Sequence, residues 1–248
     1  MNIVEYAKMR KLFGGSGGDL DALIDGSLTE ITSNAESVRS GAFLGNTWVT
    51  KIDLPKALTI NTGAFENCTK LMNVNIPSAT TMEYDIFKNC KKLVSVNAPL
   101  VETIKQYAFN MCVLIESVKF PALTLVDQYC FSRADNLKKA DFPKVKKINN
   151  NAFNNCYSFR TLILRSETMC NLGGSNAFYY CYHFSGSAHS TYNPDGLKDG
   201  YIYVPRTLID SYKAATNWTT FATQFRALED YTVDGTTTGE LDESKVSL

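Results

Sequence analysis

The sequence predicts a mainly β solenoid, a right-handed coil whose turns stack through a ladder of short parallel strands. Three observations lead to this prediction. Phenylalanine recurs every 22 residues, from Phe43 through Phe65 to Phe153. Proline keeps the same interval from Pro55 to Pro143, and Asn-Cys follows several of the phenylalanines. Units of this size cannot enclose their own apolar side chains, so a fixed period of this length indicates stacked units that share one core.

Each unit follows the pattern P-x-[AV]-x-x-[IVM]-x-x-x-A-F-x-N-C-x-x-L-x-x-V-x-[IF]-P, with substitutions. Residues 71–76, 93–98 and 115–120 end in alternating apolar and polar side chains, which predicts short strands with one buried face. Proline ends each strand because it has no amide proton. The A-F-x-N-C stretch has helical spacing over a single turn and predicts a 3₁₀-like turn. We expect about seven coils, with equivalent strands in a parallel ladder about 4.8 Å apart.

The N-terminal end departs from this regular pattern. Residues 1–20 predict a short amphipathic segment and a flexible linker, because GGSGG favours a mobile joint. The solenoid is expected over residues 21–205. Its first unit is degenerate: Val38 takes the place of Ile60, and Ala42-Phe43 that of Ala64-Phe65. This unit is expected to cover the exposed end of the stack.

The C-terminal end combines a loop, a cap and a tail. The stretch near 185–200 is rich in Gly, Ser, Asn and Asp and predicts an inserted loop. A helical cap is predicted over 206–231, because apolar residues there recur every three or four positions. These residues are Leu208, Tyr212, Ala215 and Trp218. The polar, aperiodic stretch 232–248 predicts a mobile tail or linker.

Composition excludes several classes of protein. The 25 basic and 25 acidic side chains cancel, so no net field favours nucleic acid or an anionic membrane. No run of about eighteen apolar residues occurs, so no membrane insertion is expected. The start lacks the apolar run of a secretory signal, which predicts a cytoplasmic or phage-associated location for the chain as given. A cell-surface location stays open if an export signal has been removed.

Cysteine follows the repeat. One repeat position holds five of the seven cysteines, with Ala134 in the odd unit; they are Cys68, Cys90, Cys112, Cys156 and Cys181. Stacking would place their β-carbons about 4.8 Å apart, beyond the roughly 3.5–4.5 Å that a disulfide prefers. We therefore predict a column of buried, reduced thiols that act as small apolar fillers.

Metal and catalytic chemistry find little support. No C-x-x-C pair occurs, and the spacing of Cys170, Cys181, His183 and His189 matches no familiar zinc site. Only two histidines are present, which restricts acid–base catalysis. Cys181 belongs to the core column, and His183 is expected to be a loop or surface residue. We predict no metal, no cofactor and no enzymatic activity.

The predicted binding surface is the outer face of the strands, where two rows of side chains alternate with the buried ones. The rows contain Lys51 and Asp53, Asn73 and Asn75, Ser95 and Asn97, Ser117 and Lys119, Lys139 and Asp141, and Thr161 and Ile163. The candidate ligand-binding residues among them are Asn73, Asn75, Ser95, Asn97, Ser117, Lys119, Lys139 and Asp141. Extended faces of repeat proteins commonly bind partners. The alternative is that these polar side chains only keep the sheet soluble.

A second candidate surface is the aromatic stretch before the inserted loop. Its candidate contact residues are Tyr179, Tyr180, Tyr182 and Tyr192, because tyrosine supplies a large contact area at modest entropic cost. Phe184 matches Leu71 in register and is expected in the core. The alternative for the tyrosines is local packing of the loop.

The repeat pattern over about residues 28–205 resembles the BspA-like group of bacterial leucine-rich repeats, and YVPRTLIDSYKAATNW resembles the terminal segment of such proteins. The resemblance implies an α/β-type leucine-rich repeat solenoid, mainly β, with 3₁₀ turns and a C-terminal helical cap. It also implies a role at cell surfaces, in adhesion and in binding host proteins, and related repeats occur in gut bacteria and their prophages. No catalytic residue is carried over by it.

Two hypotheses of function follow. The first is a non-catalytic binding or adhesion module that presents a repeat-built surface to a protein or glycan. The alternative is a structural or receptor-binding component of a prophage or surface assembly, attached through the N-terminal segment or the tail.

Overall fold

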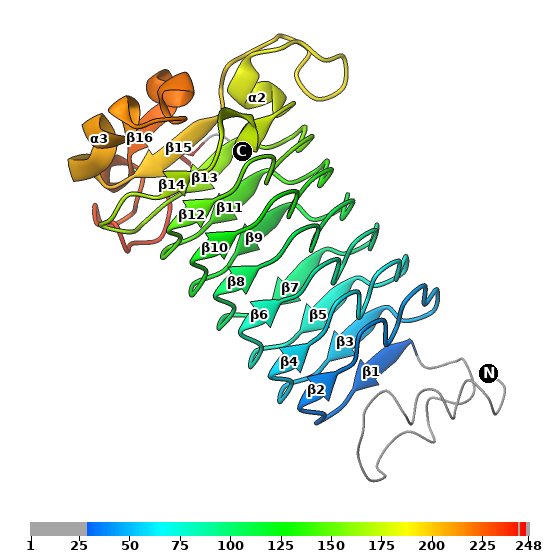
Figure 1. Ribbon diagram of the computed structural model, residues 1–248. Helices are drawn as coiled ribbons and strands as arrows, with labels where there is room; N and C mark the ends of the chain where they lie inside the picture. The colour runs from blue at the N-terminus through cyan, green and yellow to red at the C-terminus, as the bar shows by residue number, and fades with distance from the viewer. Residues whose placement is uncertain (1–28, 243, 247–248) are drawn as a thin grey trace, which may run out of the picture.

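The computed structural model describes residues 29–242 and 244–246 as an elongated stack of coils, which runs from β1 and β2 to α3 and β16 (Figure 1). The predicted segment and linker at 1–20, and the start of the predicted solenoid at 21–28, lie outside the described residues. None of the helices among the described residues is long and apolar enough to cross a membrane.

Each coil contributes a strand of three residues to one face of the solenoid. These strands are β1 (Glu30–Thr32), β3 (Lys51–Asp53), β5 (Asn73–Asn75), β7 (Ser95–Asn97), β9 (Ser117–Lys119), β11 (Lys139–Asp141) and β13 (Thr161–Ile163). Neighbours pair in parallel with equivalent repeat positions opposite each other, for example Ile52 with Val74 and Val74 with Val96. The predicted parallel ladder is therefore confirmed.

A second ladder of two-residue strands lies on another face of the coil, and the sequence analysis did not predict it. Its strands are β2 (Ser37–Val38), β4 (Thr59–Ile60), β6 (Thr81–Met82), β8 (Thr103–Ile104), β10 (Leu125–Val126), β12 (Lys147–Ile148) and β14 (Asn171–Leu172). They pair in two sheets, β2-β4 and β14-β12-β10-β8-β6, with no pairing between β4 and β6 among the described strands. Its signal in the sequence is the recurring [IVM] position after each proline. Val38 pairs with Ile60, which confirms the degenerate first unit.

The ladder of three-residue strands is interrupted, a feature that the sequence analysis did not predict. One sheet has the order β1-β3-β5-β7 and the next begins at β9, so no pairing joins β7 to β9 among the described strands. The Ser95 N–H donates a hydrogen bond to the Met72 carbonyl of the preceding coil. Among the described residues, the Ser117 N–H makes no equivalent bond. At the break, the repeat position that holds Ala98 in one coil holds the larger Phe120 in the next. The ring centroid of Phe120 lies 5.9 Å from that of Phe109.

The core is built on a stack of phenylalanine rings. The rings that recur with the repeat, from Phe43 to Phe153 and on to Phe178, are nearly fully buried. Successive ring centroids lie 5.1–5.6 Å apart. Because each ring contacts the coil before and the coil after, the core is continuous along the solenoid, as the period of the sequence predicted.

The cysteine column runs beside the phenylalanine stack, and all seven cysteines are buried and free of disulfides. The Cys68 thiol donates to the Phe43 carbonyl at 3.1 Å, and Cys90 repeats the contact with Phe65 at 3.1 Å. Burial raises the pKa of the Cys112 thiol above its usual range. The pKa of Cys170, also buried, is raised to about 12. The column thiols fill space in the core, and burial keeps the thiols of Cys112 and Cys170 protonated at neutral pH.

The turns between the two ladders have the predicted 3₁₀ character. The Glu66 N–H donates to the Gly63 carbonyl at 3.1 Å, and Cys68 N–H to Phe65 at 3.2 Å, both over three residues. The residue before the column cysteine adopts a left-handed conformation, with φ of 61° at Asn67 and 62° at Asn89. Asparagine tolerates this conformation better than most residues, which explains the recurring Asn-Cys pair.

The C-terminal end is closed by short elements. They are η2 (Ser175–Phe178), α2 (Tyr182–Ser185), β15 (Tyr201–Val204), η3 (Arg206–Leu208), α3 (Ile209–Ala214), η4 (Thr219–Gln224), β16 (Phe225–Ala227) and η5 (Leu228–Asp230). Trp218 and Tyr212 are buried and anchor the cap to the last coil. The Trp218 indole donates a hydrogen bond to the Cys170 carbonyl at 2.8 Å, and the Tyr212 hydroxyl accepts one from the Cys170 N–H at 2.7 Å. β16, which pairs in parallel with β15, was not predicted.

We predict that Phe109→Ala lowers the free energy of unfolding by about 3–5 kcal/mol, because it leaves a cavity between two stacked rings. Urea denaturation measures the change. Leu114→Ala, at a site that is 42% exposed, is the control and should change stability by less than about 0.5 kcal/mol. Equal losses for the two variants would contradict the role of the ring stack.

We also predict that the native thiols do not react with an aromatic disulfide reagent at about pH 8, because burial keeps them out of reach of the reagent. In denaturant without reductant, all seven should react. Absorbance of the released thiolate counts them. Rapid reaction of several thiols in the native protein would show that the column is open to solvent.

Candidate functional site

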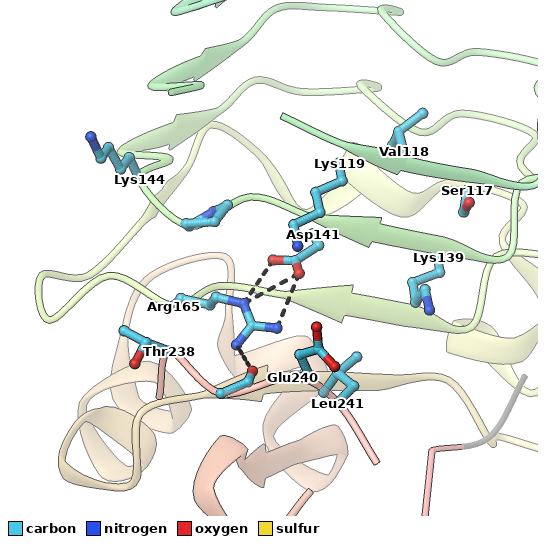
Figure 2. A pocket seen from close by; sticks show the side chains of 12 residues that line it. Ser117, Val118, Lys119, Lys139, Asp141, Lys144, Arg165, Thr238, Glu240 and Leu241 are labelled. Atoms are coloured by element: carbon cyan, nitrogen blue, oxygen red, sulfur yellow. Dashed lines mark hydrogen bonds and ion pairs between the residues drawn. The ribbon is translucent and has the colours of Figure 1, made fainter. Parts of the chain in front are cut away.

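A groove of about 710 Å³ lies on the outer face of the strands in the C-terminal half of the solenoid (Figure 2). Ser117 and Lys119 of β9 and Lys139 and Asp141 of β11 form its floor. Lys144, Arg165 and residues 238–241 complete it. Four of the twelve residues predicted to bind a ligand therefore meet in one groove.

Arg165 holds the edge of the groove together. Its guanidinium donates from Nε to Asp141 Oδ1 at 3.0 Å and from Nη2 to Asp141 Oδ2 at 3.1 Å. Nη1 donates to the carbonyls of Thr237 and Gly239, both at 2.9 Å. The side chains of Arg165 and Asp141 are only 9% and 8% exposed. Removing one partner of such a buried ion pair strongly destabilises the folded protein, because the other charge is then left unpaired.

The prediction that Asp141 faces solvent is thus wrong. Asp141 is buried, and its carboxylate orients the Arg165 guanidinium. Sequence reasoning missed Arg165 altogether. A signal was present, because Arg165 stands one full repeat after Pro143, where the period calls for the next proline. The interruption of the proline period marks the coil that contacts the end of the chain.

Residues 232–242, which we call the C-terminal strap, form the other wall of the groove. Thr232 and Leu241 form an antiparallel bridge, and the Thr232 hydroxyl donates to the Thr236 carbonyl at 2.8 Å. The mobility predicted for 232–248 stays a prediction. The structure adds that the strap contacts the solenoid through Arg165.

Two further outward positions are covered. Thr161 and Ile163, predicted on the outer rows, are both fully buried. Ile163 packs with Tyr203, Leu228 and Val246 in a small apolar cluster apart from the main core. The sequence predicted the outer rows from strand alternation alone, which does not show what later parts of the chain cover.

The remaining predicted residues of the sheet lie on β5 and β7, on the other side of the break from the groove. They are linked from coil to coil: the Ser95 hydroxyl donates to Asn73 Oδ1 at 2.7 Å, and the Asn97 amide to Asn75 Oδ1 at 2.7 Å. Asn73, Ser95 and Asn97 are exposed and Asn75 is half-buried. They form a flat polar surface in the predicted place.

The groove carries an excess of positive charge in a chain with no net charge. Four cationic side chains line it against two carboxylates. Arg165 and Asp141 neutralise each other, and the strap contributes Glu240. Lys119 and Lys144 are exposed and make no ion pair with any described residue. The ammonium groups and the Ser117 hydroxyl are suited to bind an anionic or hydrogen-bonding ligand.

The predicted tyrosines separate into two groups. Tyr182 and Tyr192 pack locally: each ring packs on Tyr157, at centroid distances of 5.4 and 4.9 Å, and His189 joins them. Tyr179 and Tyr180 are 47% and 49% exposed, and their ring centroids lie 4.2 Å apart. The structure therefore leaves these two tyrosines as the open part of the patch.

The predicted surface position of His183 is wrong. His183 is buried within α2, and its Nδ1 lies 2.6 Å from Asp199 Oδ1. Phe184 is in the core, as predicted. Cys181 donates to the Phe153 carbonyl in the thiol column, and His189 lies among the tyrosines. The described residues contain no group of three or more His, Cys, Asp or Glu side chains arranged to hold a metal ion.

Comparison with known proteins adds the family. A model described as the BspA type leucine rich repeat region matches residues 26–94 and 59–185, in six copies. A search of the curated proteins finds no significant match.

Solved structures of bacterial leucine-rich repeat proteins resemble this chain. A leucine-rich repeat protein from Eubacterium ventriosum is 20% identical, with a TM-score of 0.52 over 62% of this chain and 43% of that chain, and it shows the same fold. One from T. pallidum is 22% identical, with a TM-score of 0.46 over 54% of this chain and 66% of that chain. A third, from Bacteroides ovatus, is 22% identical, with a TM-score of 0.44 over 68% of this chain and 53% of that chain. The chain thus spans less than two thirds of the length of these three proteins.

The repeating sequence unit, the stacked phenylalanines and the parallel ladders agree with the family model, which covers more than half of the 248 residues. The chain belongs to the BspA type leucine-rich repeat family.

Proposed function

We propose that this protein is a non-catalytic binding or adhesion module that presents the outer face of its strands to a protein or glycan ligand. The observation that carries the proposal is the groove at β9, β11 and the C-terminal strap. It gathers charged and polar side chains on a face that the core does not use.

The chemistry of this face supports contact with a macromolecule. Eight of the twelve residues that line the groove are charged or carry a hydroxyl group, and such groups can bind the polar surface of a protein or glycan. The asparagine and serine rows on β5 and β7 extend the polar surface along the solenoid. Repeat proteins commonly bind partners through such extended faces.

The reactive residue types are engaged in structure. The cysteines are buried, and burial raises the pKa of the Cys112 and Cys130 thiols, so little thiolate is available as a nucleophile. His183 is buried against Asp199. These observations favour a binding role over a catalytic one, as family membership also does.

We predict that Ser117→Trp abolishes binding of ligands captured on glycan and protein arrays, because an indole at this exposed position fills the groove. Thr62→Trp, at an exposed position outside the strands of this face, is the matched control and should leave binding unchanged. Thermal unfolding checks that both variants fold. Captured ligands that bind Ser117→Trp as well as the unaltered protein would refute the proposal.

A further inference from the structure

We propose that the groove beside the C-terminal strap binds an acidic peptide segment of a protein partner, with Lys119 and Lys144 as the charge contacts. This inference rests on the proposed function and specifies the ligand class of the same groove.

The first argument is charge. Lys119 and Lys144 extend from two successive coils, both are exposed, and neither has an ion-pair partner among the described residues. Some other lysines of the solenoid are paired with acids of the neighbouring coil, as Lys105 is with Glu83 at 2.7 Å and Lys138 with Glu116 at 3.1 Å. The groove therefore holds two ammonium groups that are unpaired in the described part of the chain, where the surface is hollowed, and acidic groups of a partner would complement their charge.

The second argument is that the groove already holds peptide groups. Arg165 donates to two main-chain carbonyls of the strap, and Glu240 of the strap brings a carboxylate to the same groove (Figure 2). The chain itself thus shows that the main-chain carbonyls of a peptide segment are bound at this wall of the groove. This precedent favours an acidic peptide over a sulfated glycan.

The third argument is the polar floor of the groove. The Ser117 hydroxyl and the Lys119 ammonium of β9 both line it. A hydroxyl and an ammonium group can donate hydrogen bonds to the carbonyls and carboxylates of an acidic peptide.

The test measures fluorescence anisotropy of a labelled oligoglutamate peptide with the full chain. The double variant Lys119→Glu/Lys144→Glu should weaken binding about tenfold or more. The matched control is Lys91→Glu/Lys92→Glu, which makes the same change in net charge at two exposed residues outside the groove and should leave affinity within about twofold. Glu240→Gln, which removes the competing carboxylate of the strap, should tighten binding about two- to fivefold. Thermal unfolding confirms that each variant folds.

Each other outcome overturns the inference. Equal weakening by both double variants would show non-specific attraction. Binding of a heparin oligosaccharide but not of oligoglutamate would assign the groove to a sulfated glycan. If neither probe binds while Ser117→Trp still blocks an array ligand, the acidic-peptide inference fails and the proposed function stands. If Ser117→Trp blocks nothing either, both fail.

Discussion

Contact between equivalent side chains of successive coils is the interaction on which the rest of the structure depends. No coil encloses its own apolar groups, so burial of each phenylalanine ring depends on the rings above and below it. Full burial of one such side chain contributes roughly 1.5–3 kcal/mol before the entropy of ordering is subtracted. Stability is therefore spread along the stack, and both ends need a cover. The cap supplies one through Trp218 and Tyr212.

This arrangement also decides which residues remain for function. The column of thiols and the ring stack occupy the interior, so the groups with the most reactive chemistry are buried. The outer face of the strands keeps its side chains for solvent or for a partner. That face is divided into a flat polar part on β5 and β7 and a positively charged groove that begins at β9.

The groove exists because the end of the chain returns to the solenoid. Arg165 replaces a proline of the repeat and joins Asp141 to the strap. Because Arg165 is largely shielded from solvent, its hydrogen bonds to Asp141 and to the strap carbonyls are stronger than they would be in water. A guanidinium suits this role because its planar group of donors bonds a carboxylate and two carbonyls together. The same residues that close the end of the solenoid thus build one wall of the candidate site.

The sequence by itself determined the repeat, the interior columns, the short parallel strands and the residues of the cap, because each coil repeats one set of local contacts at a constant spacing along the chain. Only the tertiary structure decided the break between β7 and β9, the burial of Asp141, Ile163 and His183, and the groove itself. The contact between Arg165 and Thr237 joins residues 72 positions apart and follows no period. A periodic pattern encodes contacts between neighbouring coils, whereas a single contact between distant segments depends on where the whole chain brings them.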